Sequence, residues 1–197
     1  MRTILMFAVH VWTVLGAILA PMTATKLVVA WFAVRREIKK RGEVPPLFTL
    51  SPYGLKAFGG AFAAPLPCIK RMVICLQPSA LKAMSYDELK FVVAHESGHC
   101  IGAQNKELFA RYLADDYVPG MPTIGNAGVV QRCHEVEADL VAGELCHFSS
   151  QRILATRRAI FDVVAPIATA SSSLMTEAVM AENVREQIDG VRDALGL

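Results

Sequence analysis

The five residues His95-Glu96-Ser97-Gly98-His99 constrain the fold more than any other part of the chain. Two histidines four positions apart lie on one face of a helix, where both can bind the same metal ion. Glu96 lies about 100° further round such a helix, close enough to hold a water on that ion. Because one helix cannot surround a tetrahedral ion, the fold must bring a third ligand from another segment.

The residues before the histidines predict where this helix begins. Ser85 and Glu88 have the spacing of a capping box, so a helix is predicted to start near Tyr86. Leu89 and Val93 then supply part of its apolar surface. The alternative is a pair of ordinary helix histidines satisfied by hydrogen bonds, and a third ligand elsewhere in the chain argues against it.

The segment 129–148 supplies candidates for the third ligand. It has helical periodicity, and Glu135 and Asp139 are four positions apart on one face. Ala138 and Gly143 are small, which lets this helix approach a neighbour closely. One carboxylate can complete the metal shell while the other orients a histidine ring.

Two other side chains in this segment offer alternatives. Glu137 is interpreted as a solvated acid, because the helix geometry turns it away from the face of Glu135. His134 is a competing metal ligand, although a short imidazole next to Glu135 points off the same face. Cys133 and Cys146 are interpreted as small buried thiols.

Together these motifs resemble the integral-membrane gluzincin peptidases, which include the HtpX heat-shock protease and the CaaX prenyl protease. The run Leu81–Leu89 leads into the histidine motif as it does in that family. Glu135-Val136-Glu137-Ala138-Asp139 matches the second family signature, E-x-x-A-D. A further match is Ala61-Phe62-Ala63-Ala64-Pro65, which in the family belongs to a hairpin at the rim of the cleft. The resemblance extends roughly from Phe58 to Gly143.

The resemblance implies a set of roles at the site. It implies zinc ligands at His95, His99 and Glu135, with Glu96 as the general base and Asp139 in support. Family members often carry a histidine or arginine beyond the glutamate that stabilises the oxyanion. Four residues of this chain are candidates for that role: His147, Arg152, Arg157 and Arg158.

The resemblance also implies a fold and a way of binding substrate. The fold expected is α+β and mainly helical, a zincin-like metallopeptidase domain with a short β-hairpin or small sheet. Ala57–Ala63 and Ile69–Gln77 are the candidate strands. An extended polypeptide substrate is expected to pair with the strand at Ala61, Phe62 and Ala63.

A transmembrane helix is predicted at the N-terminus. Ile4–Thr25 contains no charged residue and would be about 33 Å long as a helix, enough to cross a bilayer once. Leu27–Val34 is too short for a second crossing and is expected to continue the same helix at the interface. Basic residues predominate after the span, so the positive-inside rule predicts a cytoplasmic catalytic domain. The basic run Arg35–Arg41 is interpreted as an anchor to lipid headgroups of the bilayer.

Composition agrees with this organisation. The 197 residues are expected to divide into an anchor helix with a basic juxtamembrane segment (1–41), a linker (42–56) and a catalytic domain (57–197). The net charge of +2 gives no reason to expect nucleic acid as a partner. Five cysteines without a C-x-x-C pair suit a reducing compartment. The sequence leaves the oligomeric state open.

The leading functional hypothesis is a membrane-anchored, zinc-dependent endopeptidase that cleaves membrane or membrane-proximal proteins. The alternative is a catalytically weak or inactive membrane-tethered scaffold or regulator that retains the zinc site. Gly60, where the family usually has Asn, favours this alternative, whereas Glu96 favours catalysis. A third hypothesis is a zinc amidase with a non-peptide substrate, because the chemistry at the carbonyl is shared.

Overall fold

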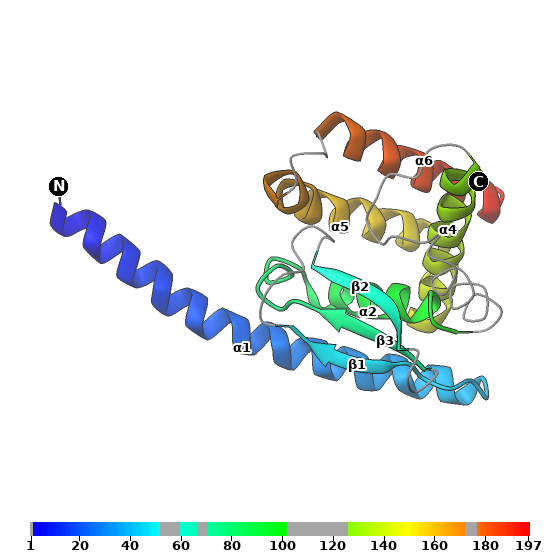
Figure 1. Cartoon of the computed structure of the whole chain (residues 1–197), viewed down its shortest axis with the longest axis horizontal. Helices are drawn as coiled ribbons and strands as arrows, with labels where there is room; N and C mark the ends of the chain where they lie inside the picture. The colour runs from blue at the N-terminus through cyan, green and yellow to red at the C-terminus, as the bar shows by residue number, and fades with distance from the viewer. Residues whose placement is uncertain (1, 52–59, 67–70, 102–125, 172–176) are drawn as a thin grey trace.

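The computed structural model describes residues 2–51, 60–66, 71–101, 126–171 and 177–197 (Figure 1). These residues are mainly helical with one small sheet, as the sequence predicts. The elements along the chain are α1 (Arg2–Lys40), β1 (Leu47–Leu50), β2 (Ala61–Leu66), β3 (Arg71–Leu76), α2 (Tyr86–Gly98), α4 (Asn126–Cys146), α5 (Ser150–Ser171) and α6 (Glu177–Leu195).

The sheet has three strands in the order β1-β3-β2. β2 runs antiparallel to β3 with Ala63 opposite Ile74, which is the hairpin pairing that the sequence predicts. β2 continues through Pro65 and Leu66, beyond the predicted end of the strand at Ala63. β2 is an edge strand of this sheet, a position where the missing N–H of a proline is tolerated. Residues 67–70 between the two strands lie outside the described part.

β1 lies within the segment 42–56, which was expected to be a linker. It pairs in parallel with β3, with Leu47 opposite Val73. A parallel pair needs a long connection between its strands. Here the connection includes β2, so three separate segments build the sheet.

The second half of α1 belongs to the hydrophobic core. Leu27, Ala30, Val34 and Ile38 are fully buried, and their spacing of three or four residues forms one stripe along the helix. The stripe packs in the same core as α2, which α1 contacts directly. The segment therefore continues the same helix, as expected, but it packs on the domain as well.

The expected membrane span, Ile4–Thr25, falls mostly on residues 2–20, whose side chains lie outside the described set. Figure 1 shows this part of α1, in dark blue, extending away from the rest of the chain. Among the residues that were searched, which are the described ones, no helix combines the length and the apolar character needed to cross a membrane.

α2 lies at the centre of the described fold and begins where the sequence predicts. Ser85 Oγ accepts from the Glu88 backbone N–H at 3.3 Å, and the Ser85 N–H donates to Glu88 Oε2 at 2.7 Å. The predicted capping box is therefore confirmed. Leu89, Phe91 and Val93 are fully buried, and α2 contacts α1, α4, α5 and the sheet. The histidines at its end are consequently held in the interior.

Candidate metal centre

The last turn of α2 places both histidines on one side of the helix. His99 follows the final helical residue but keeps helical backbone angles (φ −62°, ψ −16°). Its backbone N–H donates to the carbonyl of His95 at 3.3 Å. Both side chains are buried. The four-residue spacing therefore acts as it would inside a continuous helix.

A close contact between α2 and α4 brings the acidic residues to the histidines. Gly98 lies so near α4 that a Cβ there would be 3.0 Å from Ala138 Cα and 3.1 Å from the Ala138 carbonyl oxygen. Ala138 is itself fully buried. The small residues expected to allow close approach therefore do so at this position. Glu135 and Asp139, on the same side of α4, reach the face of α2 that carries His95.

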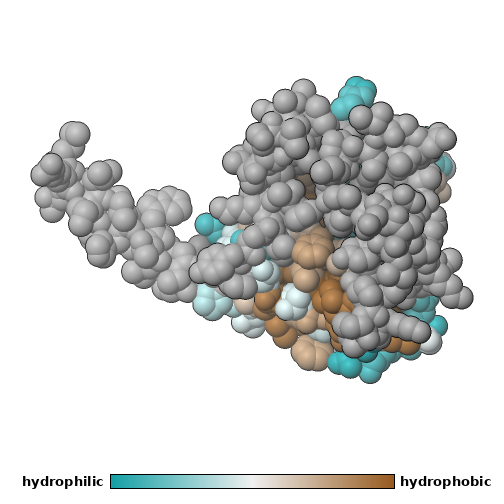
Figure 2. All heavy atoms as spheres, in the orientation of Figure 1, coloured by the Kyte–Doolittle hydropathy of each residue, from teal (hydrophilic) through white to brown (hydrophobic). Residues whose placement is uncertain are grey.

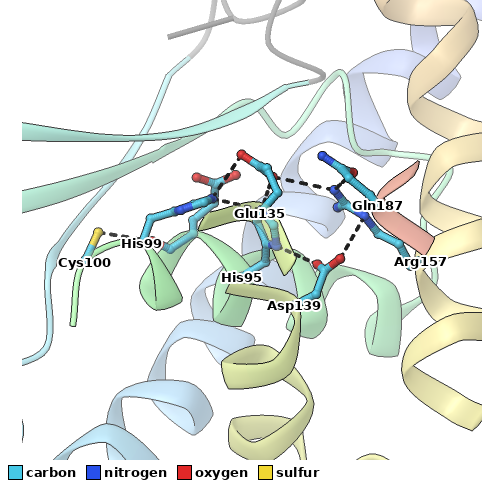
Figure 3. Close-up of polar contacts among 8 residues, drawn as sticks. His95, His99, Cys100, Glu135, Asp139, Arg157 and Gln187 are labelled. Carbon is cyan, nitrogen blue, oxygen red and sulfur yellow. Dashed lines mark hydrogen bonds and ion pairs between the residues drawn. The ribbon is translucent and has the colours of Figure 1, made fainter. Parts of the chain in front are cut away.

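Three side chains from these two helices form a compact triangle. Figure 3 shows the side chains of His95, His99 and Glu135 pointing toward one another. The two Nε2 atoms are 3.1 Å apart, and Glu135 carboxylate oxygens lie 3.2 Å from His95 Nε2 and 3.5 Å from His99 Nε2. Ligands bound tetrahedrally at 2.0–2.1 Å are separated by about 3.3 Å. The group can therefore hold a metal ion.

Asp139 determines which nitrogen of His95 is available to that ion. Asp139 Oδ1 lies 2.7 Å from His95 Nδ1, so this nitrogen carries the hydrogen and donates it. The lone pair of Nε2 then faces the Glu135 carboxylate at 3.2 Å. Two acceptors at that distance require a cation or a proton between them, which is the condition that a metal ion satisfies.

Arg157, from α5, extends this arrangement behind the ligands. Its Nε lies 3.2 Å from Asp139 Oδ2, and its Nη2 lies 3.7 Å from Glu135 Oε2. Gln187, from α6, accepts a hydrogen bond from Nη2 at 2.6 Å (Figure 3). One guanidinium therefore forms ion pairs with both Glu135 and Asp139, and Gln187 of α6 binds the guanidinium in turn.

The pKa values reflect this crowding of charge in the metal-free protein. Burial alone would lower the pKa of His95, but the charge and hydrogen bond of Asp139, aided by Glu135, raise it to about 10. Burial lowers the pKa of His99 to about 4, although Glu135 opposes this. Burial acts to raise the pKa of Glu135, but His99, His95 and Arg157 hold it below the ordinary value. Near neutral pH the metal-free His95 is therefore protonated on both ring nitrogens. Its positive charge lies beside Glu135, where a metal ion would otherwise supply it.

Glu96 is buried beside the ligands. Burial raises its pKa to about 7; the charge of His95 opposes the rise and that of Glu135 adds to it. Burial raises the pKa of the Cys75 thiol on β3, and the carboxylate of Glu96 raises it further. Glu96 therefore acts electrostatically on both the ligand group and the sheet. A pKa near 7 suits a group that accepts and returns a proton.

The remaining predicted residues of the site segment lie outside the ligand group. Glu137 is exposed, in agreement with its interpretation as a solvated acid. His134 is buried but does not belong to the group that can hold a metal. Of the four candidates for oxyanion stabilisation, Arg157 is the one that contacts this group. His147 lies beside Glu37, Arg152 pairs with Asp87, and Arg158 is exposed.

The strand expected to bind substrate lies at one edge of the three-stranded sheet. Ala61, Phe62 and Ala63 are partly buried in β2, which contacts α2. Among the described strands, β2 pairs only with β3. Gly60 before it has φ +89°, and a Cβ there would lie 2.6 Å from Ala80 Cβ. Glycine at this position, where the gluzincin family usually has Asn, therefore has a structural cause in this chain.

Two residues of the site were not identified from the sequence. Gln187 lies far along the chain in an amphipathic helix, where nothing in the pattern distinguishes it from a surface residue. The role of Gly98 could have been predicted. It is a small residue in the last turn of a helix that must approach a second helix, and that second helix carries the small residue Ala138.

Comparisons with protein-family models, with curated proteins and with solved structures found no match to this chain.

Proposed function

We propose that this chain is a membrane-anchored, zinc-dependent endopeptidase of the gluzincin type, similar to the peptidases that its motifs resemble. The observation that supports this most is the triangle of His95, His99 and Glu135. The two Nε2 atoms are 3.1 Å apart, one Glu135 oxygen lies 3.2 Å from His95 Nε2, and the other lies 3.5 Å from His99 Nε2. These spacings suit ligands of a tetrahedral ion. Three protein ligands leave one coordination position for water or substrate, as in catalytic zinc sites.

The donor set favours zinc. Two neutral imidazole nitrogens and one carboxylate are the ligands of several zinc hydrolases, whereas calcium and magnesium take mainly oxygen ligands. Asp139 supports the same assignment, because metal-binding histidines commonly donate their other N–H to a carboxylate. Its contact with Arg157 keeps that carboxylate in place.

The protein groups then have separate roles in peptide hydrolysis. A bound zinc ion lowers the pKa of water to about 7 and polarises the substrate carbonyl. Glu96 accepts the proton of the attacking water on its carboxylate and returns it to the leaving amine. An extended peptide pairs with the edge strand β2, and this holds the peptide backbone near α2. Arg157 positions Glu135 and Asp139 through its ion pairs.

The proposed location is the membrane, with one crossing by the N-terminal part of α1 and the catalytic domain in the cytoplasm. The uncharged run from Ile4 to Thr25 supports the crossing. The basic residues that follow it support the orientation. A substrate would then be a membrane protein or a polypeptide close to the membrane surface.

The test compares the full-length chain with Glu96→Gln, in detergent, using an unfolded protein as substrate. Wild type should contain one zinc ion and cleave the substrate, and a chelator should stop cleavage. Glu96→Gln should retain the zinc, because Glu96 is outside the ligand triangle, but cleave about 10²–10⁴-fold more slowly.

Glu137→Gln provides the matched control, because it makes the same change at an exposed position of α4. It should cleave as wild type does. Full cleavage by Glu96→Gln with zinc bound would contradict the proposed mechanism. A zinc-loaded wild type that cleaves no polypeptide but hydrolyses small amides would instead identify an amidase.

A further inference from the structure

A hollow lies between α1 and β1, and none of the residues that line it belongs to the candidate metal centre. It has a volume of about 370 Å³. Volumes of this order are at the lower end of the range for small-molecule sites. Six of its lining residues carry the argument: Trp31, Phe32, Arg35, Pro45, Phe48 and Arg71.

Aromatic and proline rings give this hollow a fixed shape. Trp31 stacks on Phe48 with ring centroids 5.5 Å apart and an angle of 7° between the planes. Trp31 and Pro45 are buried, whereas Phe32 is 58% exposed. The stacked pair therefore forms a rigid wall, and Phe32 presents an apolar surface to whatever lies outside.

Two guanidinium groups give the hollow a positive charge. Arg71 Nη2 donates to the carbonyl of Pro45 at 2.6 Å, which fixes the side chain and leaves other N–H groups to donate. Arg35 lines the same space from α1. Among the described residues, no acidic residue lines the hollow and no carboxylate forms an ion pair with Arg35 or Arg71. Two guanidinium groups that line one hollow favour a phosphate as ligand.

The surface beside the hollow is apolar. Met22, Val29 and Phe32 are each more than half exposed. Residues seven and ten positions apart lie within about 80° of one another on a helix, so these three form one stripe on α1. Figure 2 shows brown, hydrophobic atoms among paler and teal ones in the area where Figure 1 draws α1 and β1. An apolar stripe beside a hollow lined by two arginines complements an amphiphile with an anionic head.

We propose that this hollow binds the headgroup of an anionic phospholipid. Arg35 and Arg71 contact the phosphate, and the acyl chains lie along Val29 and Phe32 toward the N-terminal end of α1. A soluble phosphate would use the guanidinium groups but not the exposed stripe. The proposal goes beyond peptide hydrolysis and does not depend on the metal, so Glu96→Gln should bind the same lipid as wild type.

The test titrates the full-length chain, in neutral detergent, with dioleoyl phosphatidylglycerol and with zwitterionic dioleoyl phosphatidylcholine. Bound lipid is counted by native mass spectrometry. Wild type should bind one phosphatidylglycerol saturably, and phosphatidylcholine much more weakly. Arg35→Gln should weaken phosphatidylglycerol binding about fivefold, and the double variant Arg35→Gln/Arg71→Gln by about thirtyfold.

Arg36→Gln is the matched control, because Arg36 is adjacent and exposed but does not line the hollow. It should bind phosphatidylglycerol as wild type does. Equal weakening by Arg36→Gln, or equal binding of the two lipids, would overturn the proposal. Competition by glycerol 3-phosphate at the same concentrations as lipid would overturn the lipid assignment. Arg71 also holds Pro45, so Arg35→Gln alone decides the result, with its thermal unfolding as the check of folding.

Discussion

At the scale of single residues, Asp139 links the metal ligands to the rest of the protein. It is fully buried, and its two oxygens have different partners: His95 Nδ1 at 2.7 Å and Arg157 Nε at 3.2 Å. A buried carboxylate is stable only with such compensation. Because one side of Asp139 is fixed by Arg157, the other can hold the imidazole in the orientation and tautomer that metal binding needs.

Replacing Asp139 by Asn should therefore weaken zinc binding. The amide keeps the shape of the carboxylate but loses its charge beside His95 and Arg157. We expect the zinc affinity to fall about 10–100-fold, measured by competition with a fluorescent chelator. Glu137→Gln, on the exposed side of the same helix, should leave the affinity unchanged. An unaltered affinity in Asp139→Asn would mean that His95 is oriented by other contacts.

Zinc binding should also release a proton. Asp139 and Glu135 raise the pKa of His95 to about 10 against the effect of burial, so metal-free His95 is protonated at pH 8. His99, with a pKa lowered to about 4, is already neutral at that pH. Zinc binds the neutral form of both imidazoles, so each ion should displace about one proton from His95 and bind more tightly as the pH rises toward 10.

Calorimetry at pH 8 in buffers of different ionisation enthalpy measures this proton. Wild type should release about two protons per zinc ion, one from His95 and most of one from the zinc-bound water, whose pKa is about 7. Asp139→Asn should release fewer, because the pKa of His95 falls when the charge beside it is removed. If wild type releases only the proton of the water, about one per ion, His95 is neutral before the ion binds, and the assigned charge state of the ligand group is wrong.

At the scale of elements, the site depends on how closely α2 and α4 approach. The sequence predicted the start of α2, the shared face of His95 and His99, and the shared face of Glu135 and Asp139. Capping and helical periodicity are local properties, so they can be predicted from the sequence. It also indicated close packing at Ala138. It named Arg157 as one of four candidates for the site without choosing among them, and it did not predict Gln187, which contacts Arg157 from α6. Those contacts depend on tertiary packing, which leaves no periodic signal in the chain.

Gly98→Ala tests that approach. Alanine favours a helix by about 1 kcal/mol over glycine, but its Cβ would lie 3.0 Å from the Ala138 backbone, which cannot rotate away. Such overpacking costs about 1–3 kcal/mol. We expect the two helices to separate slightly. The loss in free energy of zinc binding should then exceed the loss in free energy of unfolding of the metal-free protein. Wild-type zinc affinity in Gly98→Ala would show that the ligand triangle tolerates a wider spacing.

At the scale of the whole molecule, the second half of α1 is both a continuation of the N-terminal helix and part of the domain. Its buried stripe packs in the core, and its end is tied to the C-terminal end of α4. Arg41 pairs with Glu144 at 2.9 Å, and Glu37 Oε2 lies 3.3 Å from His147 Nε2. The sequence suggested a boundary near residue 41, because the charges and prolines there resemble a linker. The folded chain instead places β1 and α1 on the same core.

Ile38→Ala measures how much the domain depends on α1. Ile38 is fully buried near the end of the helix, and truncating such a side chain costs about 2–5 kcal/mol. Lys39→Ala, one position further on the exposed side, should change the free energy of unfolding by about 0.5 kcal/mol or less. Urea unfolding of the full chain, followed by circular dichroism in detergent, compares the two. If α1 did not contribute to the core, both variants would unfold as wild type does. A loss confined to Ile38→Ala would mean that α1 supports the candidate metal centre through α2, which it contacts directly.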